Sequence, residues 1–139
     1  MPETAQALNG AFPIVPYPEP RAAIGWLERT FGGVATEVHP PDPDEPLVHA
    51  EVRIGTGVVM LSDTARVGEN EFSFPGPVAV YVVVDDPDAL HERAVGAGVE
   101  IVRGLEDQPY GSRDFAARDH NGNVWSFGTY RPAGGSPAG

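Results

Sequence analysis

The sequence predicts a single α+β domain built from two tandem βαβββ modules. Seventeen glycines and fifteen prolines divide the 139 residues into short segments whose hydrophobic periods can be read. The order of these segments, a strand, a helix and three strands, occurs twice along the chain. The turn-forming stretch at residues 54–60 also has a counterpart at residues 119–125. We expect module one at residues 11–63, module two at 77–131, a disordered leader at 1–10 and a disordered tail at 132–139.

Module one begins with an apolar run and ends with an alternating strand followed by a more uniformly apolar one. Ile24, Leu27 and Phe31 lie at helical spacing, and Gly32-Gly33 ends that helix. The proline-rich segment at 40–46 lacks amide donors and is predicted to be an exposed loop. The predicted strands are 12–15, 34–38, 47–54 and 58–61.

Module two repeats this order with clearer signals at its turns. Asp86-Pro87 is a favourable helix start, and Gly98 ends the helix. Asn121-Gly122 predicts a tight hairpin turn, and residues 103–112 are predicted to be a loop. The predicted strands are 78–84, 99–102, 113–119 and 124–130.

The two modules must pack together, because one helix covers only one face of a four-stranded sheet. Side by side, they are expected to form a curved eight-stranded mixed sheet with the helices outside and a concave cavity inside. A concave sheet face of this kind is a natural site for a small ligand.

Composition excludes several classes of function. Twenty acidic residues against nine arginines give a net charge of −11, which disfavours binding to nucleic acid or to a membrane surface. The chain has no lysine and no cysteine, which removes Schiff-base and thiol chemistry. No signal peptide or long apolar stretch is evident, so the expected location is the cytoplasm.

The paired modules resemble the vicinal oxygen chelate superfamily of glyoxalase, bleomycin-resistance and dioxygenase proteins. Residues 48–55, 60–63 and 105–126 resemble its PhnB-like branch more closely. The resemblance implies the fold described above and a homodimer. The superfamily includes isomerases, lyases, dioxygenases and plain binding proteins, so the fold alone does not select an activity.

The resemblance also implies four positions at which the enzymes bind a metal ion, on the first and fourth strands of each module. Aligned by helix starts and hairpin glycines, these positions hold Ala11, Leu61, Ala79 and Ser126. None of these side chains is an imidazole or a carboxylate. We therefore expect no metal, no other cofactor and no catalytic residue.

Polar residues are predicted to form the floor of the cavity. His49 and Glu51 share one strand face, and the repeat places Asp114 opposite His49. Ser126 and Leu61, at two of the implied metal positions, are expected to line the same cavity. Alternatively, His49 and Glu51 are a solvent-facing row or two ligands of an incomplete metal site.

Aromatic residues are predicted to form the walls and mouth of the cavity. Tyr81 lies in the middle of its strand and is expected to face the cavity, while Phe74 and Tyr110 come from adjoining loops. Stacking on such rings grips planar ligands. Arg113 is a candidate for binding a ligand carboxylate. The alternative for each residue is ordinary packing in the core or at a dimer interface.

Two functions are therefore open. The first is a metal-free protein that sequesters an aromatic or cationic compound, such as an antibiotic, in its cavity. The second is a metal-dependent lyase, isomerase or dioxygenase of the same superfamily. In a third interpretation the cavity has no role and the dimer surface serves a partner.

Overall fold

The predicted pair of βαβββ modules is confirmed by the computed structural model, which describes residues 11–69 and 74–132. The predicted leader, and the predicted tail from residue 133 onward, lie outside the described residues. Within the part of the chain that is described, no helix is long and apolar enough to cross a membrane. Module one comprises β1 (Ile14–Tyr17), α1 (Pro20–Phe31), β2 (Val34–His39), β3 (His49–Ile54) and β4 (Gly57–Asp63). Module two comprises β5 (Ala79–Val83), α2 (Pro87–Gly96), β6 (Glu100–Asp107), β7 (Arg113–Arg118) and β8 (Val124–Gly128).

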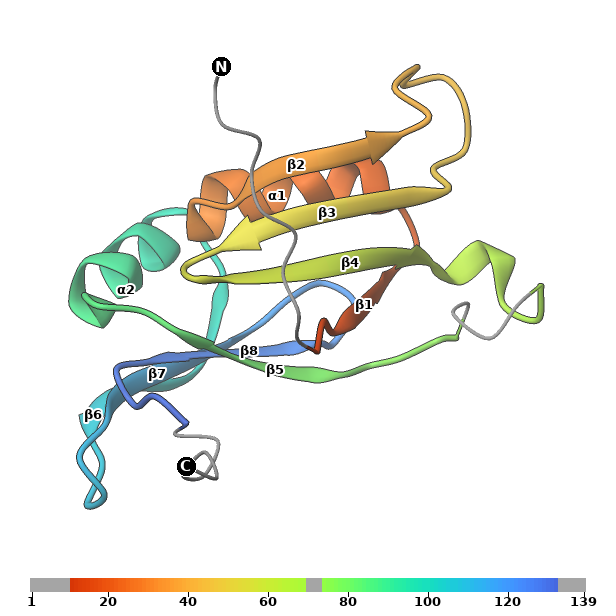
Figure 1. Ribbon diagram of the computed structural model, residues 1–139. Coiled ribbons are helices and arrows are strands. Elements are labelled where there is room, and N and C mark those ends of the chain that lie inside the picture. The colour runs from red at the N-terminus through yellow and green to blue at the C-terminus, as the bar shows by residue number, and fades with distance from the viewer. Residues whose placement is uncertain (1–10, 70–73, 133–139) are drawn as a thin grey trace, which may run out of the picture.

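The strands form two separate four-stranded sheets, in the orders β1-β4-β3-β2 and β5-β8-β7-β6, rather than the one continuous sheet predicted (Figure 1). In each sheet the first strand pairs in parallel with the fourth, and the other pairs are antiparallel. Pro13 and Pro16 deprive the β1 region of two amide donors, which limits its ability to extend the ladder into the other module.

A capping interaction marks the end of α1 and the start of α2. Gly32 follows α1 in the left-handed conformation, with φ of 71°, and its amide donates to the carbonyl of Glu28. Before α2, the Asp86 carboxylate accepts a hydrogen bond from the Ala89 amide at 3.1 Å. The apolar stripe of each helix then packs against its own sheet, and the two helices also touch each other.

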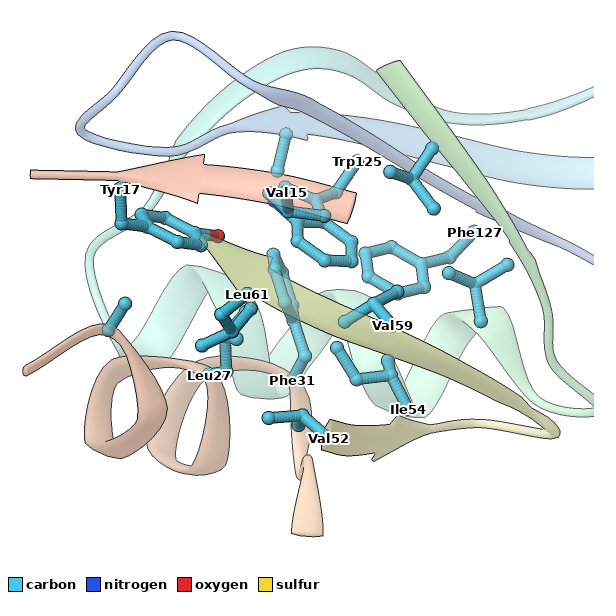
Figure 2. Close-up of a cluster of buried hydrophobic side chains, with 14 of the residues drawn as sticks. Val15, Tyr17, Leu27, Phe31, Val52, Ile54, Val59, Leu61, Trp125 and Phe127 are labelled. Atoms are coloured by element: carbon cyan, nitrogen blue, oxygen red, sulfur yellow. The ribbon is translucent and has the colours of Figure 1, made fainter. Parts of the chain in front are cut away.

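One core joins the two modules. Val15 and Leu61 pack with Leu27 on the helix-facing side of the first sheet, while Trp125 and Phe127 extend from the second sheet (Figure 2). The Phe31 ring lies between the two groups, with centroid distances of 5.6 Å to Trp125 and 4.6 Å to Phe127. Among the described residues, no helix packs on the other face of each sheet; we call these the open faces.

Each hairpin turn contacts the first strand of the other module. The Asn121 and Asn123 side chains donate to the Pro16 carbonyl at 2.7 and 3.1 Å. Reciprocally, Thr56 Oγ1 lies 3.4 Å from the Val83 carbonyl. We call the first set of contacts, together with the buried Asp119 that Tyr17 touches at 2.7 Å, the module clasp.

Candidate ligand-binding face

Strand register determines which predicted residues lie on an open face. Side chains alternate along a strand, so neighbours in sequence point to opposite faces. In module two, Tyr81 pairs with Ser126, and both point away from the core. In module one the equivalent pair is Ile14 with Met60.

Leu61 is a correction to the predicted site. Its side chain is buried in the core among Leu27 and its neighbours (Figure 2), and Met60 takes the predicted position on the open face. The cause is the hairpin length: four residues separate the paired Arg53 and Val58, whereas five separate the equivalent pair, Arg118 and Val124. Aligning the turns through their glycines therefore shifts module one by one residue.

Helix starts give the same one-residue shift for the first strand. Pro20 and Pro87 each lie six residues after Ile14 and Tyr81, so the counterpart of Ala79 is Phe12 and not Ala11. The four positions implied for a metal are thus Phe12, Met60, Ala79 and Ser126. None offers a nitrogen or carboxylate ligand, so this donor set does not fit a divalent ion.

A tyrosine pocket occupies one end of the open face of module two. Tyr81, Tyr110 and Tyr130, with Pro132, line a pocket of about 440 Å³. The Tyr110 and Tyr130 rings meet edge to face at 5.5 Å, and the Tyr81 hydroxyl donates to the Tyr130 carbonyl at 2.7 Å. The three tyrosine residues are 38%, 62% and 44% exposed, so a ligand can reach all of them.

Beneath this pocket lies a buried carboxylate. The Asp114 side chain is only 3% exposed, and its Oδ1 accepts hydrogen bonds from Arg103 Nη2 at 2.6 Å and Gln108 Nε2 at 3.0 Å. Burial opposes ionisation, but these donors hold the pKa of the Asp114 carboxyl below its usual value. Asp114 therefore positions the surrounding donors and does not itself reach a ligand.

The floor and wall of the pocket are tightly packed. Burial raises the pKa of the Tyr81 hydroxyl, so this group stays protonated at neutral pH. Gly128 lies directly beneath: a Cβ there would sit 2.9 Å from the Tyr81 hydroxyl and 2.7 Å from the Asp114 Cβ. The Ser112 hydroxyl is also within 3.0 Å of that point and accepts from the Tyr130 amide.

An apolar groove adjoins the tyrosine pocket. It has a volume of about 390 Å³ and is lined by the start of the described chain, the β3–β4 hairpin and β5, including Phe12, Val58 and Val83. Tyr81 lines both spaces. In place of one enclosed cavity, the single chain thus presents two open pockets that meet at this ring.

The other predicted residues are distributed over both modules. His49 and Glu51 lie on the open face of module one and contact each other, Nε2 to Oε2, at 2.8 Å. Among the described residues, no hydrogen bond joins this pair to the tyrosine pocket. Within 11–69 and 74–132, no group of three or more histidine or acidic side chains is arranged to hold a metal ion.

Arg113 and Phe74 lie away from the tyrosine pocket. Arg113 is next to Asp114 on β7 and therefore points the opposite way, where it binds Asp88 at 2.7 Å and Asp107 at 3.2 Å. This pairing holds the pKa of the Asp88 carboxyl below its usual value. Phe74 is half-buried before β5 and does not line the pocket.

Sequence reasoning missed Arg103, Gln108 and Tyr130. Residues 103–107 were predicted to be a loop, but β6 continues to Asp107 and carries Arg103 to Asp114. The arginine Nε is buried without a hydrogen-bond partner among the described residues and lies 3.9 Å from Glu106 Oε1, so it contributes to the ion-pair network around Asp114. The alternation of residues 101–105 was the signal that could have extended the strand.

The fold agrees with what comparison with known proteins shows. The chain belongs to the Glyoxalase/Bleomycin resistance protein/Dioxygenase superfamily, whose family model matches residues 11–127. The protein Mb0911c of Mycobacterium bovis is 39% identical over 113 residues, which cover 77% of this chain and 74% of that protein.

Solved structures show the same fold. TioX from Micromonospora sp. ML1 is similar with a TM-score of 0.71 and 31% identity, covering 88% of this chain and 100% of TioX. A lactoylglutathione lyase from Agrobacterium tumefaciens has a TM-score of 0.66 at 16% identity, covering 88% of this chain and 94% of the lyase, which shows the fold alone.

Proposed function

We propose that this protein is a metal-independent small-molecule-binding protein that sequesters an aromatic or cationic compound, such as an antibiotic. The observation that carries the proposal is the tyrosine pocket above the buried and hydrogen-bonded Asp114. Its volume of about 440 Å³ falls within the range of sites for small organic ligands. Placement in the PhnB-like branch of the superfamily belongs to the same proposal.

Three tyrosine rings suit a flat or positively charged ligand. Each stacked aromatic pair contributes about 0.5–1.5 kcal/mol beyond area burial, and ring faces also attract cations. The net charge of −11 adds a long-range field that draws cations toward the protein. Asp114 contributes little to this attraction, because Arg103 neutralises it at 2.6 Å.

The same chemistry favours binding without conversion of the ligand. The Tyr81 hydroxyl is protonated and donates to a backbone carbonyl, so it is not a base. The Asp114 carboxylate is turned toward Arg103 and Gln108 and is not available to take a proton from a ligand. These assignments support sequestration over the metal-dependent lyase, isomerase or dioxygenase.

We also propose that the protein works as a homodimer in the cytoplasm. Val48 on module one is 70% exposed and leaves apolar surface that a second copy would cover. Light scattering coupled to size-exclusion chromatography tests this: we expect twice the mass of 14.7 kDa, and a monomer at micromolar concentration would contradict it.

Calorimetric titration with a ligand panel tests the binding function. The panel contains two planar aromatic cations (proflavine and ethidium), choline as a non-aromatic cation, and 2-naphthol as a neutral aromatic. We expect the planar cations to bind most tightly. Tyr81→Ala should weaken them about tenfold, the loss of about one stacking contact, whereas Tyr81→Phe should retain most of the affinity.

Val95→Ala serves as the matched control, because Val95 is exposed on α2 and lines neither the tyrosine pocket nor the apolar groove. Circular dichroism establishes that each variant is folded. If no panel member binds, or if Tyr81→Ala binds as tightly as the control variant, the proposal is wrong. Mass spectrometry of the recovered ligand then separates the two functions: an unchanged mass supports sequestration, and a changed mass supports an enzyme.

A further inference from the structure

A second groove lies at the junction of the two modules, away from the tyrosine pocket. It forms where the C-terminal end of α1, the first turns of α2 and the β3–β4 turn meet, and its volume is about 510 Å³. Phe31, Val34 and Leu90 supply apolar surface, while Arg53, Arg93 and Asp86 supply charge. The residues that line it do not overlap with those that line the tyrosine pocket.

The groove is locally cationic on an acidic protein. Two of the nine arginines line it, against the single carboxylate of Asp86. Asp86 accepts a hydrogen bond from the Ala89 amide at the start of α2, so its charge is already engaged by the helix. In a chain of net charge −11, a groove with a positive surplus stands out as a place where an anion is attracted.

The two arginine side chains differ in the contacts that they make. Arg93 donates through Nε and Nη2 to the carbonyls of Arg29 and Glu28, at 3.1 and 3.0 Å, and so it fixes the C-terminal end of α1 against α2. Arg53 is exposed on β3, and among the described residues its guanidinium makes no hydrogen bond or ion pair. Its guanidinium is therefore free to form the paired hydrogen bonds that a carboxylate accepts.

Two glycines bring the modules together at this groove. A Cβ at Gly55 would approach the Val83 carbonyl within 2.9 Å, and Gly32 lies against Arg93 with φ of 71°. A molecule seated in the groove would therefore contact residues of both modules. Because it binds only the assembled pair, it would also stabilise the folded chain.

We propose that this groove is a second ligand site, which takes a small organic carboxylate with an apolar body. The carboxylate binds Arg53, and the apolar body lies against Phe31 and Leu90. Arg93 is a positioning residue that holds the two helices at the groove. This site is independent of the tyrosine pocket and of the function proposed for that pocket.

The test uses 4-phenylbutyrate and its neutral analogue 4-phenylbutyramide in low-salt buffer. Binding is measured by calorimetry on the full chain, and the site is located by NMR shifts of backbone amides. We expect the acid to bind at least about tenfold more tightly than the amide, as a charge-assisted contact requires. The amides of Gly32, Gly55 and Ala89 should shift.

Two variants test the assignment to this groove. Arg53→Gln should weaken the acid about tenfold, and Ala89→Leu should weaken it by filling the groove. Arg118→Gln is the matched control, because Arg118 holds the position of Arg53 in module two and pairs with Glu100 outside the groove.

The proposal is overturned by any of four results: no saturable binding of the acid, equal affinity for acid and amide, an Arg53→Gln effect no larger than that of Arg118→Gln, or shifts that map to Tyr81 and Tyr130. Failure of the cation panel at the tyrosine pocket leaves all four readouts unaffected.

Discussion

Replacing Asp119 by asparagine tests whether the module clasp holds the two halves together. Asp119 is 5% exposed, and its carboxylate accepts five hydrogen bonds. Oδ2 accepts from the Tyr17 hydroxyl at 2.7 Å, from Trp125 Nε1 at 3.0 Å and from Asn123 Nδ2 at 3.1 Å. Oδ1 accepts from the amides of Asn121 at 3.0 Å and Asn123 at 2.9 Å. Burial raises the pKa of the Tyr17 hydroxyl far above its usual value, and the charge of Asp119 and its hydrogen bond with Tyr17 raise it further.

The magnitude follows from counting acceptors. Asparagine has the same shape, but one carboxylate oxygen becomes an NH2 group, so at least two of the five donors face a donor. A buried donor without an acceptor costs about 1–3 kcal/mol, and we expect Asp119→Asn to lower the free energy of unfolding by about 3 kcal/mol. For a chain of this length that is roughly 10 °C in Tm. Tyr17→Phe removes one donor and leaves four, so it should cost about 1 kcal/mol.

Urea unfolding followed by tryptophan fluorescence measures both variants, because Trp125 is part of the clasp. Asp42→Asn is the control, since Asp42 lies in the exposed loop after β2. If Asp119→Asn costs no more than Tyr17→Phe, the five-donor account of the clasp is wrong. If Asp119→Asn costs about 3 kcal/mol but leaves the tryptophan fluorescence of the folded protein unchanged, the disruption lies away from Trp125. That result would also contradict the five-donor account.

Three further predictions follow from the open face of module two. Gly128→Ala should lower the free energy of unfolding by about 1–3 kcal/mol in urea titration, because its Cβ would sit 2.7 Å from that of Asp114; Gly104→Ala, in open space on β6, should be harmless by comparison. The pKa of Asp114 is lowered in the folded state, so its ionisation stabilises the fold above about pH 4. That contribution is lost as the pH falls through the folded pKa, so the stability advantage of wild type over Asp114→Asn should shrink between pH 6 and pH 3 in guanidinium unfolding; a constant difference would refute this. Arg113→Gln should leave both Tm and affinity for planar cations nearly unchanged, since its ion pairs with Asp88 and Asp107 are exposed, and a large loss of affinity would return Arg113 to the site.

The helices and strands were predictable because residue spacing and capping residues, which lie close together in the sequence, determine them. The spacing of Leu27 and Phe31 with Gly32 after them fixes α1, and Asp86-Pro87 fixes the start of α2, as the observed caps confirm. All eight predicted strands are present. The division into two sheets was not predictable in this way, because it depends on which strand edges meet in space.

The site was harder to predict, because it depends on the phase of each strand. Arg113 and Asp114 are adjacent on a strand and cannot both face a ligand; Asp114 lies on the open face, and Arg113 points toward Asp88. Leu61 was misplaced by a single residue because the two hairpins differ in length. The contact between Arg103 and Asp114 exists because β6 extends through residues 103–107. From the sequence, a loop was predicted there.

The unequal hairpins also mean that the two halves of the chain are no longer interchangeable. An artificial chain made of module one repeated twice would have the four residues 54–57 where the natural chain has the five residues 119–123. It would then lack the asparagines that reach Pro16 and the acid that receives Tyr17. If the chain arose by internal duplication, the segment at 119–123 is where the second copy acquired contacts that the first lacks, and a symmetrical ancestor would have held its modules together without this clasp.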